Sequence, residues 1–226
     1  MRKLILYLIL FLLPVVNNAR ITTMNPGEVS AGDIYAALKL ADTGLVRTAF
    51  DLAVKGLEKL CAEGKLKNAN LLTIADYSQS SKKKRLYVID LKNKKLLFNT
   101  YVAHGRNTGD EYARSFSNKE GSLKSSLGFY VTEKPMVCSH TGYSLAINGV
   151  EKGINDRAAE REIIIHGADY ATEDFIRKYG QLGRSFGCPA LPPDLNKPII
   201  DSIKGGTCLF IYNPDESYIR SSPLLN

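Results

Sequence analysis

The chain has 226 residues and a formal net charge of +7, with 44% hydrophobic and 23% charged residues. This length suits one packed domain with an N-terminal appendage and leaves too little chain for two full domains. The composition is that of a globular protein, which excludes a low-complexity chain, and the sequence contains no internal repeat.

The first 19 residues have the layout of a secretory signal. Arg2 and Lys3 form a positive head, and residues 4–16 form an apolar run of 13 residues. A helix needs about 20 apolar residues to cross a bilayer. We therefore expect a signal peptide over residues 1–19, cleaved after Ala19, and export to the periplasm or cell envelope. The alternative is an uncleaved signal segment, which is the only membrane contact that we expect.

Residues 20–69 are predicted to form a helical lead that packs on the catalytic domain. A capping-box pattern at Ser30 and Asp33 indicates a helix that ends near Leu40. Apolar residues then recur at helical spacing over residues 46–60, which predicts a second, amphipathic helix.

From Leu71 onward the pattern changes to short β-rich runs. Thr172 can cap a short helix that ends at Gly180, and another helix is expected over residues 194–204. We therefore expect a mainly β domain of the α+β class over residues 70–226, decorated by a few short helices. The predicted strands cover residues 71–77, 85–91, 96–102, 128–132, 144–148, 162–167 and 207–212.

The densest basic run is Lys82-Lys83-Lys84-Arg85, between the first two predicted strands. Such a run can bind nucleic acid, but no aromatic residue interleaves it. A solvated hairpin tip is the favoured interpretation, and we predict no nucleic-acid partner.

The four cysteines are Cys61, Cys138, Cys188 and Cys208. An even count in an exported protein suggests two disulfides, but one working thiol would leave at most one bridge among the others. Cys61 and Cys208 lie in apolar patterns typical of small core residues. No Cys-x-x-Cys pair occurs, and the histidine spacing does not indicate a metal site, so we expect no metal.

Two segments carry the chemical signal. His166 ends the apolar strand predicted over residues 162–167, where a buried imidazole needs hydrogen-bond partners. Cys188 follows Gly187, which allows close approach of the backbone, and precedes Pro189, which stiffens the turn. Taken alone, a histidine such as His166 is structural at least as often as catalytic, and an inert thiol is the favoured interpretation of Cys188. Together they offer a thiol and the imidazole that could deprotonate it.

These residues resemble the YkuD-type L,D-transpeptidases, in the branch of murein L,D-transpeptidase catalytic domain proteins. The family signature is a histidine, a spacer and Ser/Thr-x-Gly-Cys, which here is His166 followed by Ser185-Phe186-Gly187-Cys188. The resemblance covers residues 45–212 and is specific as a combination of motifs. The other similar segments are residues 85–91, 102–106, 125–130, 142–145, 155–158, 165–170 and 183–191.

The resemblance implies a YkuD-like β-sandwich or barrel-like domain that acts on peptidoglycan stem peptides. Cys188 would attack the carbonyl at the L-centre of the diamino acid, and His166 would take the thiol proton. Ser185 would orient the imidazole, and the amides of Gly187 and Cys188 would form the oxyanion hole. The reaction would release D-alanine and form 3→3 cross-links. The resemblance implies no cofactor, and we expect a monomer.

Substrate recognition is expected to differ from the broader family. Its members often carry an arginine two residues after the cysteine, thought to hold the substrate carboxylate, and here that position is Ala190. Arg184 is a candidate replacement, although an ion pair is an equal alternative. Tyr143 and His140 are the other candidate substrate-binding residues, although a surface or loop role is favoured for His140. His104 could also line the cleft, but a surface or loop role is favoured.

Several other functions remain to be compared with transpeptidation. An L,D-carboxypeptidase would use the same machinery with water as acceptor, and a wall-binding module would need no chemistry. Sortases are also β-rich, but their Thr-x-x-Thr-Cys strand does not match Gly187-Cys188-Pro189. Papain-like and NlpC/P60 peptidases place cysteine before histidine, which is opposite to the order here.

Overall fold

The computed structural model describes residues 31–226, so the predicted signal peptide lies outside the described residues. The helices are α1 (Ala31–Ala37), α2 (Arg47–Ala62), α3 (Glu173–Tyr179), α4 (Pro193–Ile203) and α5 (Glu216–Ser221), with 3-10 turns η1 (Leu40–Thr43) and η2 (Asp169–Ala171). The strands are β1 (Leu71–Asp76), β2 (Leu86–Asp90), β3 (Lys95–Thr100), β4 (Gly128–Cys138), β5 (Gly142–Gly149), β6 (Ile164–Gly167), β7 (Ala190–Leu191) and β8 (Cys208–Tyr212).

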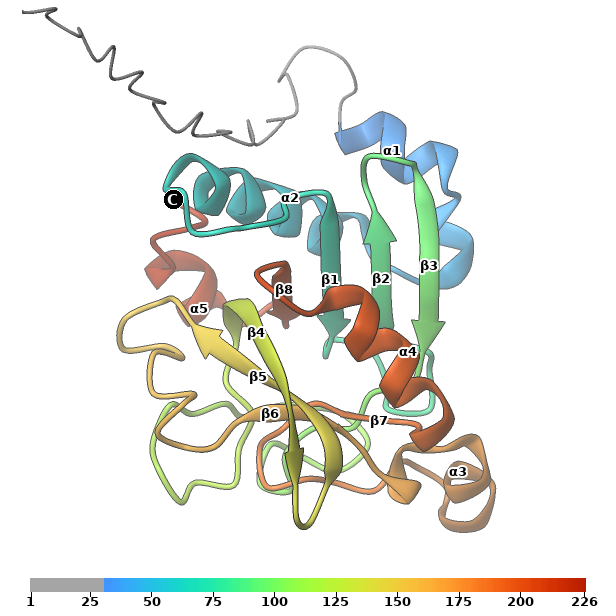
Figure 1. Ribbon diagram of the computed structural model, residues 1–226. Helices are drawn as coiled ribbons and strands as arrows, with labels where there is room; N and C mark the ends of the chain where they lie inside the picture. The colour runs from blue at the N-terminus through green and yellow to red at the C-terminus, as the bar shows by residue number, and fades with distance from the viewer. Residues whose placement is uncertain (1–30) are drawn as a thin grey trace, which may run out of the picture.

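The strands form one mixed sheet in the order β3-β2-β1-β8-β4-β5-β6-β7. The pairs β1–β8 and β6–β7 are parallel, and the remaining neighbours are antiparallel. The sheet curls until its two edge strands approach each other (Figure 1). After β3 the chain reaches β7, where Ala103 and Ala190 exchange two backbone hydrogen bonds of 2.8 and 3.2 Å. The result is a barrel-like, nearly closed sheet, as the family resemblance implied.

The helical lead shares its hydrophobic core with the sheet. α2 lies along one side of the sheet (Figure 1) and contributes the fully buried Phe50, Ala53 and Leu60. Gly56 faces Phe129 of β4 so closely that a Cβ at this position would lie 2.0 Å from the ring. In the structure, α2 therefore packs against the β-rich part of the chain.

The predicted strands agree with the structure to within a few residues, except for the end of β4 and the short strand β7. β4 continues to Cys138, six residues beyond its predicted end, and its pairing with β5 shifts register next to Pro135. β7 has only two residues, and neither it nor α5 was predicted. Thr172 caps α3 by accepting a hydrogen bond from the Phe175 amide, as expected.

The prediction for the basic run was wrong at one position. Lys82, Lys83 and Lys84 are exposed at the connection between β1 and β2, as expected. Arg85 is fully buried instead, because its guanidinium donates to the carbonyls of Val102 and Gln79.

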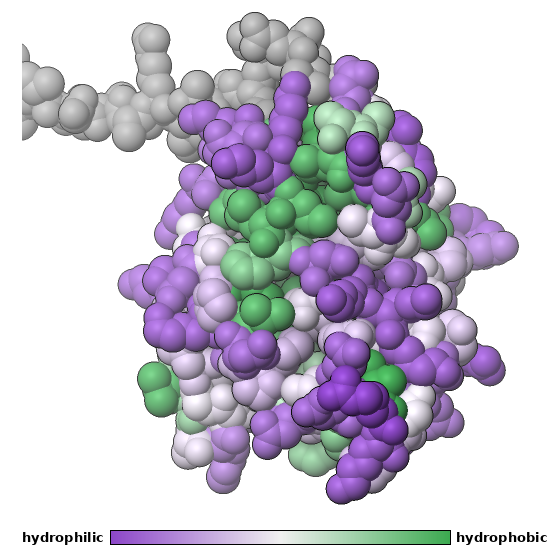
Figure 2. Space-filling view, turned by 90° about the vertical axis from the view of Figure 1, so that its right-hand side faces the viewer, coloured by the Kyte–Doolittle hydropathy of each residue, from purple (hydrophilic) through white to green (hydrophobic). Residues whose placement is uncertain are grey.

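Figure 2 shows the face on the side of β3, where hydrophobic residues form a patch among polar ones. β3 is an edge strand with half-exposed side chains, and Leu97 is 38% exposed. Within residues 31–226, no helix combines the length and the apolar composition needed to span a bilayer.

Candidate active site

β6 and the segment leading into β7 bring the histidine and the cysteine side by side in the fold. His166 pairs in register with Ala190, and its amide donates to the Pro189 carbonyl over 3.4 Å. Two residues before His166 on the same strand, the Ile164 amide lies 3.5 Å from the Cys188 sulfur. The Cys188 thiol therefore lies on the segment that enters the neighbouring strand β7. It is level with Ile164, two residues before His166 on β6.

The imidazole of His166 is held by a carbonyl of its own strand. Nδ1 lies 3.0 Å from the Gly167 carbonyl oxygen, which can only accept, so Nδ1 carries the proton. Nε2 is then left with a lone pair. Burial lowers the pKa of His166, which keeps the ring neutral at pH 7. A neutral imidazole with a fixed tautomer is the form that a general base requires.

The thiol of Cys188 is surrounded mainly by backbone. Its sulfur also lies 3.7 Å from the Glu162 carbonyl oxygen. Burial raises the pKa of Cys188, while the Ile164 amide and the charge of Arg161 act in the opposite direction. Within the described chain, no hydrogen bond joins this sulfur to the imidazole, so their direct contact stays a prediction.

Ser185 does not orient the imidazole, contrary to expectation. Its hydroxyl donates to the Cys188 carbonyl over 2.6 Å and accepts from the Gly187 amide over 3.0 Å. Its own carbonyl accepts from the Arg106 amide. Ser185 therefore closes the cysteine turn, which comprises residues 183–189, and Gly167 provides the orienting carbonyl. The sequence contained no sign of this, because every residue has a carbonyl.

The Gly187 amide is occupied by this turn, so it is unavailable for the predicted oxyanion hole. Glycine is required here for another reason. Its φ is +132°, and a Cβ would lie 2.9 Å from both the Lys124 carbonyl and the Ile163 side chain. The Ser125 hydroxyl donates to the Gly187 carbonyl over 3.0 Å and so holds the turn against the segment before β4.

A buried polar network supports the loop that packs against the cysteine turn. An Arg85 nitrogen lies 2.7 Å from Nδ1 of His104, and Nε2 of His104 lies 3.2 Å from the Gly109 carbonyl. Arginine can only donate, so Nδ1 accepts and Nε2 carries the proton. Burial and the neighbouring Arg85 charge lower the pKa of His104 to about 3. His104 is 1% exposed, so it has no surface role, but it does lie in a loop, between β3 and β4.

Arg161 packs beside the cysteine turn. It donates to the carbonyls of Ser117 and Lys124 and to the hydroxyls of Ser122 and Ser126. All these acceptors are neutral, so its charge is not cancelled by a bonded carboxylate. This is why it lowers the pKa of Cys188.

The comparisons with known proteins agree with this geometry. A family model described as "L,D-transpeptidase catalytic domain" matches residues 41–212. The chain belongs to this family. The YkuD-type resemblance is therefore confirmed, and the search of curated proteins finds no match.

Solved structures show similarity in fold. An L,D-transpeptidase from Mycobacterium smegmatis is 12% identical, with 64% of this chain and 59% of that chain covered and a TM-score of 0.39. The helical cell shape determining protein Pgp2 from Campylobacter jejuni is 16% identical, with 75% and 57% covered and a TM-score of 0.44. An L,D-transpeptidase from Stackebrandtia nassauensis is 15% identical, with 74% and 67% covered and a TM-score of 0.38. The chain spans about three fifths of the length of the first two.

The three predicted substrate-binding residues of this transpeptidase-family domain have different surroundings. Arg184 forms an ion pair with Asp110. The Tyr143 hydroxyl donates to Asp201 of α4 over 2.7 Å. His140 is exposed at the turn between β4 and β5. Their contact with substrate stays a prediction for each.

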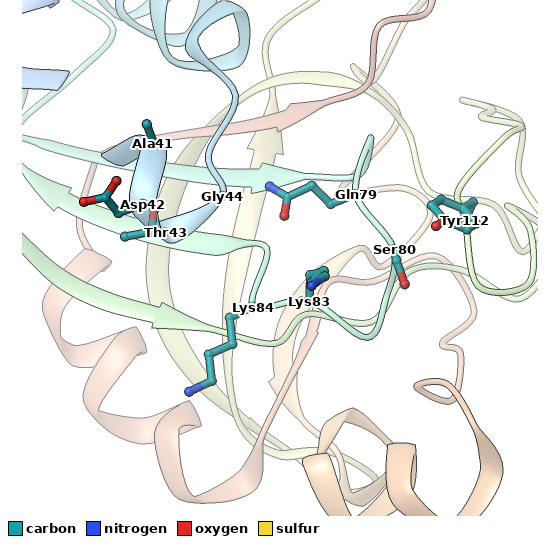
Figure 3. Close-up of a pocket in the computed structure, with 9 residues that line it drawn as sticks. All are labelled: Ala41, Asp42, Thr43, Gly44, Gln79, Ser80, Lys83, Lys84 and Tyr112. Carbon is teal, nitrogen blue, oxygen red and sulfur yellow. The ribbon is translucent and has the colours of Figure 1, made fainter. Parts of the chain in front are cut away.

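A pocket of about 530 Å³ lies away from the cysteine turn. Figure 3 shows its walls, which come from η1, from the connection between β1 and β2, and from Tyr112. It contains neither Cys188 nor His166, so we do not assign the reaction to it. Residues 31–226 contain no cluster of His, Cys, Asp and Glu that could hold a metal ion.

Proposed function

We propose that the protein is an exported cysteine acyltransferase that forms 3→3 cross-links between peptidoglycan stem peptides. The observation that carries the proposal is the His166 tautomer. The Gly167 carbonyl fixes the proton on Nδ1, leaving Nε2 as a base on the strand next to Cys188. Family membership supports the substrate class.

In the first half of the reaction, Cys188 attacks the carbonyl at the L-centre of the diamino acid. His166 takes the thiol proton and delivers it to the departing amine, so that the C–N bond breaks and D-alanine leaves. The product of this step is a thioester on Cys188. Because burial raises the pKa of the thiol, we expect proton transfer to accompany attack rather than precede it.

In the second half, the side-chain amine of another stem attacks the thioester. Its proton passes through His166 to the departing sulfur, which restores the thiol and leaves a new amide bond. Water in place of the amine would give an L,D-carboxypeptidase. Two amides were predicted to donate to the oxyanion, and that of Gly187 is already bonded to the Ser185 hydroxyl. The Cys188 amide is therefore the remaining candidate donor.

A carbapenem tests the acyl-enzyme step, as the family resemblance implies. We expect intact-protein mass spectrometry to detect one adduct on the wild-type protein and none on Cys188→Ala. His166→Ala should slow adduct formation by about 10²–10⁴-fold, because the general base is lost. Cys61→Ala is the matched control, because it removes a half-buried cysteine of α2 and should keep the adduct.

Product analysis with a purified disaccharide-tetrapeptide separates the alternatives. A cross-linked dimer with loss of D-alanine supports transpeptidation, and a tripeptide alone supports carboxypeptidation. An adduct that persists in Cys188→Ala would show that another residue is the nucleophile. Wall binding with neither adduct nor turnover would favour a binding module.

A further inference from the structure

A second pocket, of about 410 Å³, opens directly beside the cysteine turn. Its walls include Gly183, Arg184 and Phe186 of that turn, together with Phe175 and Tyr179 of α3. Phe186 and Tyr179 are 67% and 57% exposed, which is unusual for two large aromatic side chains of one pocket. Arg106 completes the wall, and its guanidinium lies 5.7 Å from the centre of the Phe186 ring.

Within residues 31–226, Arg106 supplies an uncompensated positive charge to the pocket, whereas the charge of Arg184 is offset by its ion pair with Asp110. None of the residues that line the pocket is acidic, whereas Arg106 and Arg184 both are basic. The Lys178 ammonium lies 5.1 Å from the centre of the ring of Tyr179, one of the lining residues. An arginine with free donors in a pocket favours a ligand that carries a negative charge.

Three arginines surround the cysteine turn, and their hydrogen bonds distinguish them. Arg161 is occupied by four neutral oxygens of the protein. Arg184 is occupied by Asp110 and the Gly109 carbonyl. In the described part of the chain, no oxygen accepts a hydrogen bond from the Arg106 guanidinium, which instead lies over the ring of Phe186. Arg106 is thus the arginine whose fork of donors is available to a ligand.

The backbone of Arg106 is fixed relative to the nucleophile. Its amide donates to the Ser185 carbonyl over 2.8 Å, and Gly105 approaches Gly187 so closely that a Cβ would lie 3.0 Å from its Cα. Phe186 is two residues before Cys188, which is at most about 7 Å of extended chain. A peptide whose scissile carbonyl lies at Cys188 can therefore reach the pocket with its next one or two residues.

We propose that this pocket binds a carboxylate of the stem peptide, with Arg106 as the anion-binding residue and Phe186 as the platform beneath it. Arg106 would then replace the arginine that is absent at Ala190. The inference rests on the proposed function for the identity of the ligand. The carboxylate belongs either to the terminal D-alanine or to an internal acidic residue of the stem.

Binding measured without turnover tests the pocket. Cys188→Ala and Cys188→Ala/Arg106→Gln are compared by calorimetry with three disaccharide-tetrapeptides: one with free carboxylates, one amidated at the terminal D-alanine and one amidated at the internal acid. We expect Arg106→Gln to weaken binding of the free form by about 10- to 100-fold, the range for a charge-assisted bidentate contact. The amidation that abolishes this difference identifies the carboxylate.

Two further variants sharpen the result in the same Cys188→Ala background. Arg220→Gln removes an exposed arginine of α5 and should leave binding unchanged. Arg184→Gln should weaken binding less than Arg106→Gln. Equal affinity of the Arg106→Gln and parent proteins for the free form would overturn the inference, as would a larger loss in Arg184→Gln.

The Arg106→Gln substitution also distinguishes a failure of the pocket proposal from a failure of the acyltransferase proposal. With Cys188 restored, turnover that survives Arg106→Gln at unchanged KM refutes the pocket and leaves the acyltransferase in place. Tight, Arg106-dependent binding in a protein whose Cys188 forms no adduct supports the pocket and refutes the acyltransferase.

Discussion

Acidification should destabilise this protein through His104, and His104→Asn should remove that effect. Its pKa is about 3 in the folded protein, mainly because of burial and then because of the Arg85 charge, against an ordinary value of 6.5. In the unfolded chain His104 therefore binds a proton below about pH 6.5, whereas in the folded chain it does so only below about pH 3. Stability consequently falls as the pH falls through this window.

The two pKa values set the magnitude. Between pH 7 and pH 4.5, His104 alone costs about 2.5 kcal/mol of unfolding free energy, since each pH unit within the window costs about 1.4 kcal/mol. Asparagine can retain an acceptor for Arg85 and does not titrate. The variant starts less stable at pH 7 by about 1 kcal/mol, because the bond to the Gly109 carbonyl is lost.

Urea unfolding at pH 7, 5.5 and 4.5 measures the difference between the wild type and His104→Asn. We expect this difference to move by about 2.5 kcal/mol in favour of the variant as the pH falls, because every other titrating group is shared. His140→Asn shows whether loss of an exposed histidine has the same effect. Parallel pH dependence in wild type and His104→Asn would refute the reasoning.

Two further predictions concern the cysteine turn. Gly187→Ala should lower stability by about 1–3 kcal/mol and slow acylation of Cys188, because its φ of +132° is strained for alanine and the Cβ meets the Lys124 carbonyl. Gly64→Ala is the control in thermal melts and acylation assays, since its φ is +66° but nothing lies within 4 Å of the added Cβ; equal loss of acylation in both would contradict the steric argument. The rate of Cys188 alkylation by iodoacetamide should keep rising above pH 9, because burial raises the thiol pKa. A rate that reaches its plateau near neutral pH would instead indicate a preformed thiolate.

Much of the fold could be predicted from the sequence because its signals are local. Apolar periodicity located α2 and all the longer strands, and the Thr172 cap and Gly180 bounded α3. The two-residue β7 could not be found in this way. It is a strand only because β6 on one side and the Ala103 segment on the other supply its hydrogen bonds.

In the candidate site, too, some features could be predicted from residue type and others depend on the tertiary structure. His166, Cys188 and Gly187 were predicted from residue type, since thiol, imidazole and a residue without Cβ each have a limited set of uses. What orients the imidazole is a backbone carbonyl, which no residue type can signal. The sequence also could not separate Arg106 from Arg184, because whether a guanidinium is available depends on which acceptors the folded chain brings to it. The sequence by itself identified the candidate reacting groups, and the tertiary structure decided their tautomers, their protonation and their partners, because those depend on burial and on contacts between distant segments.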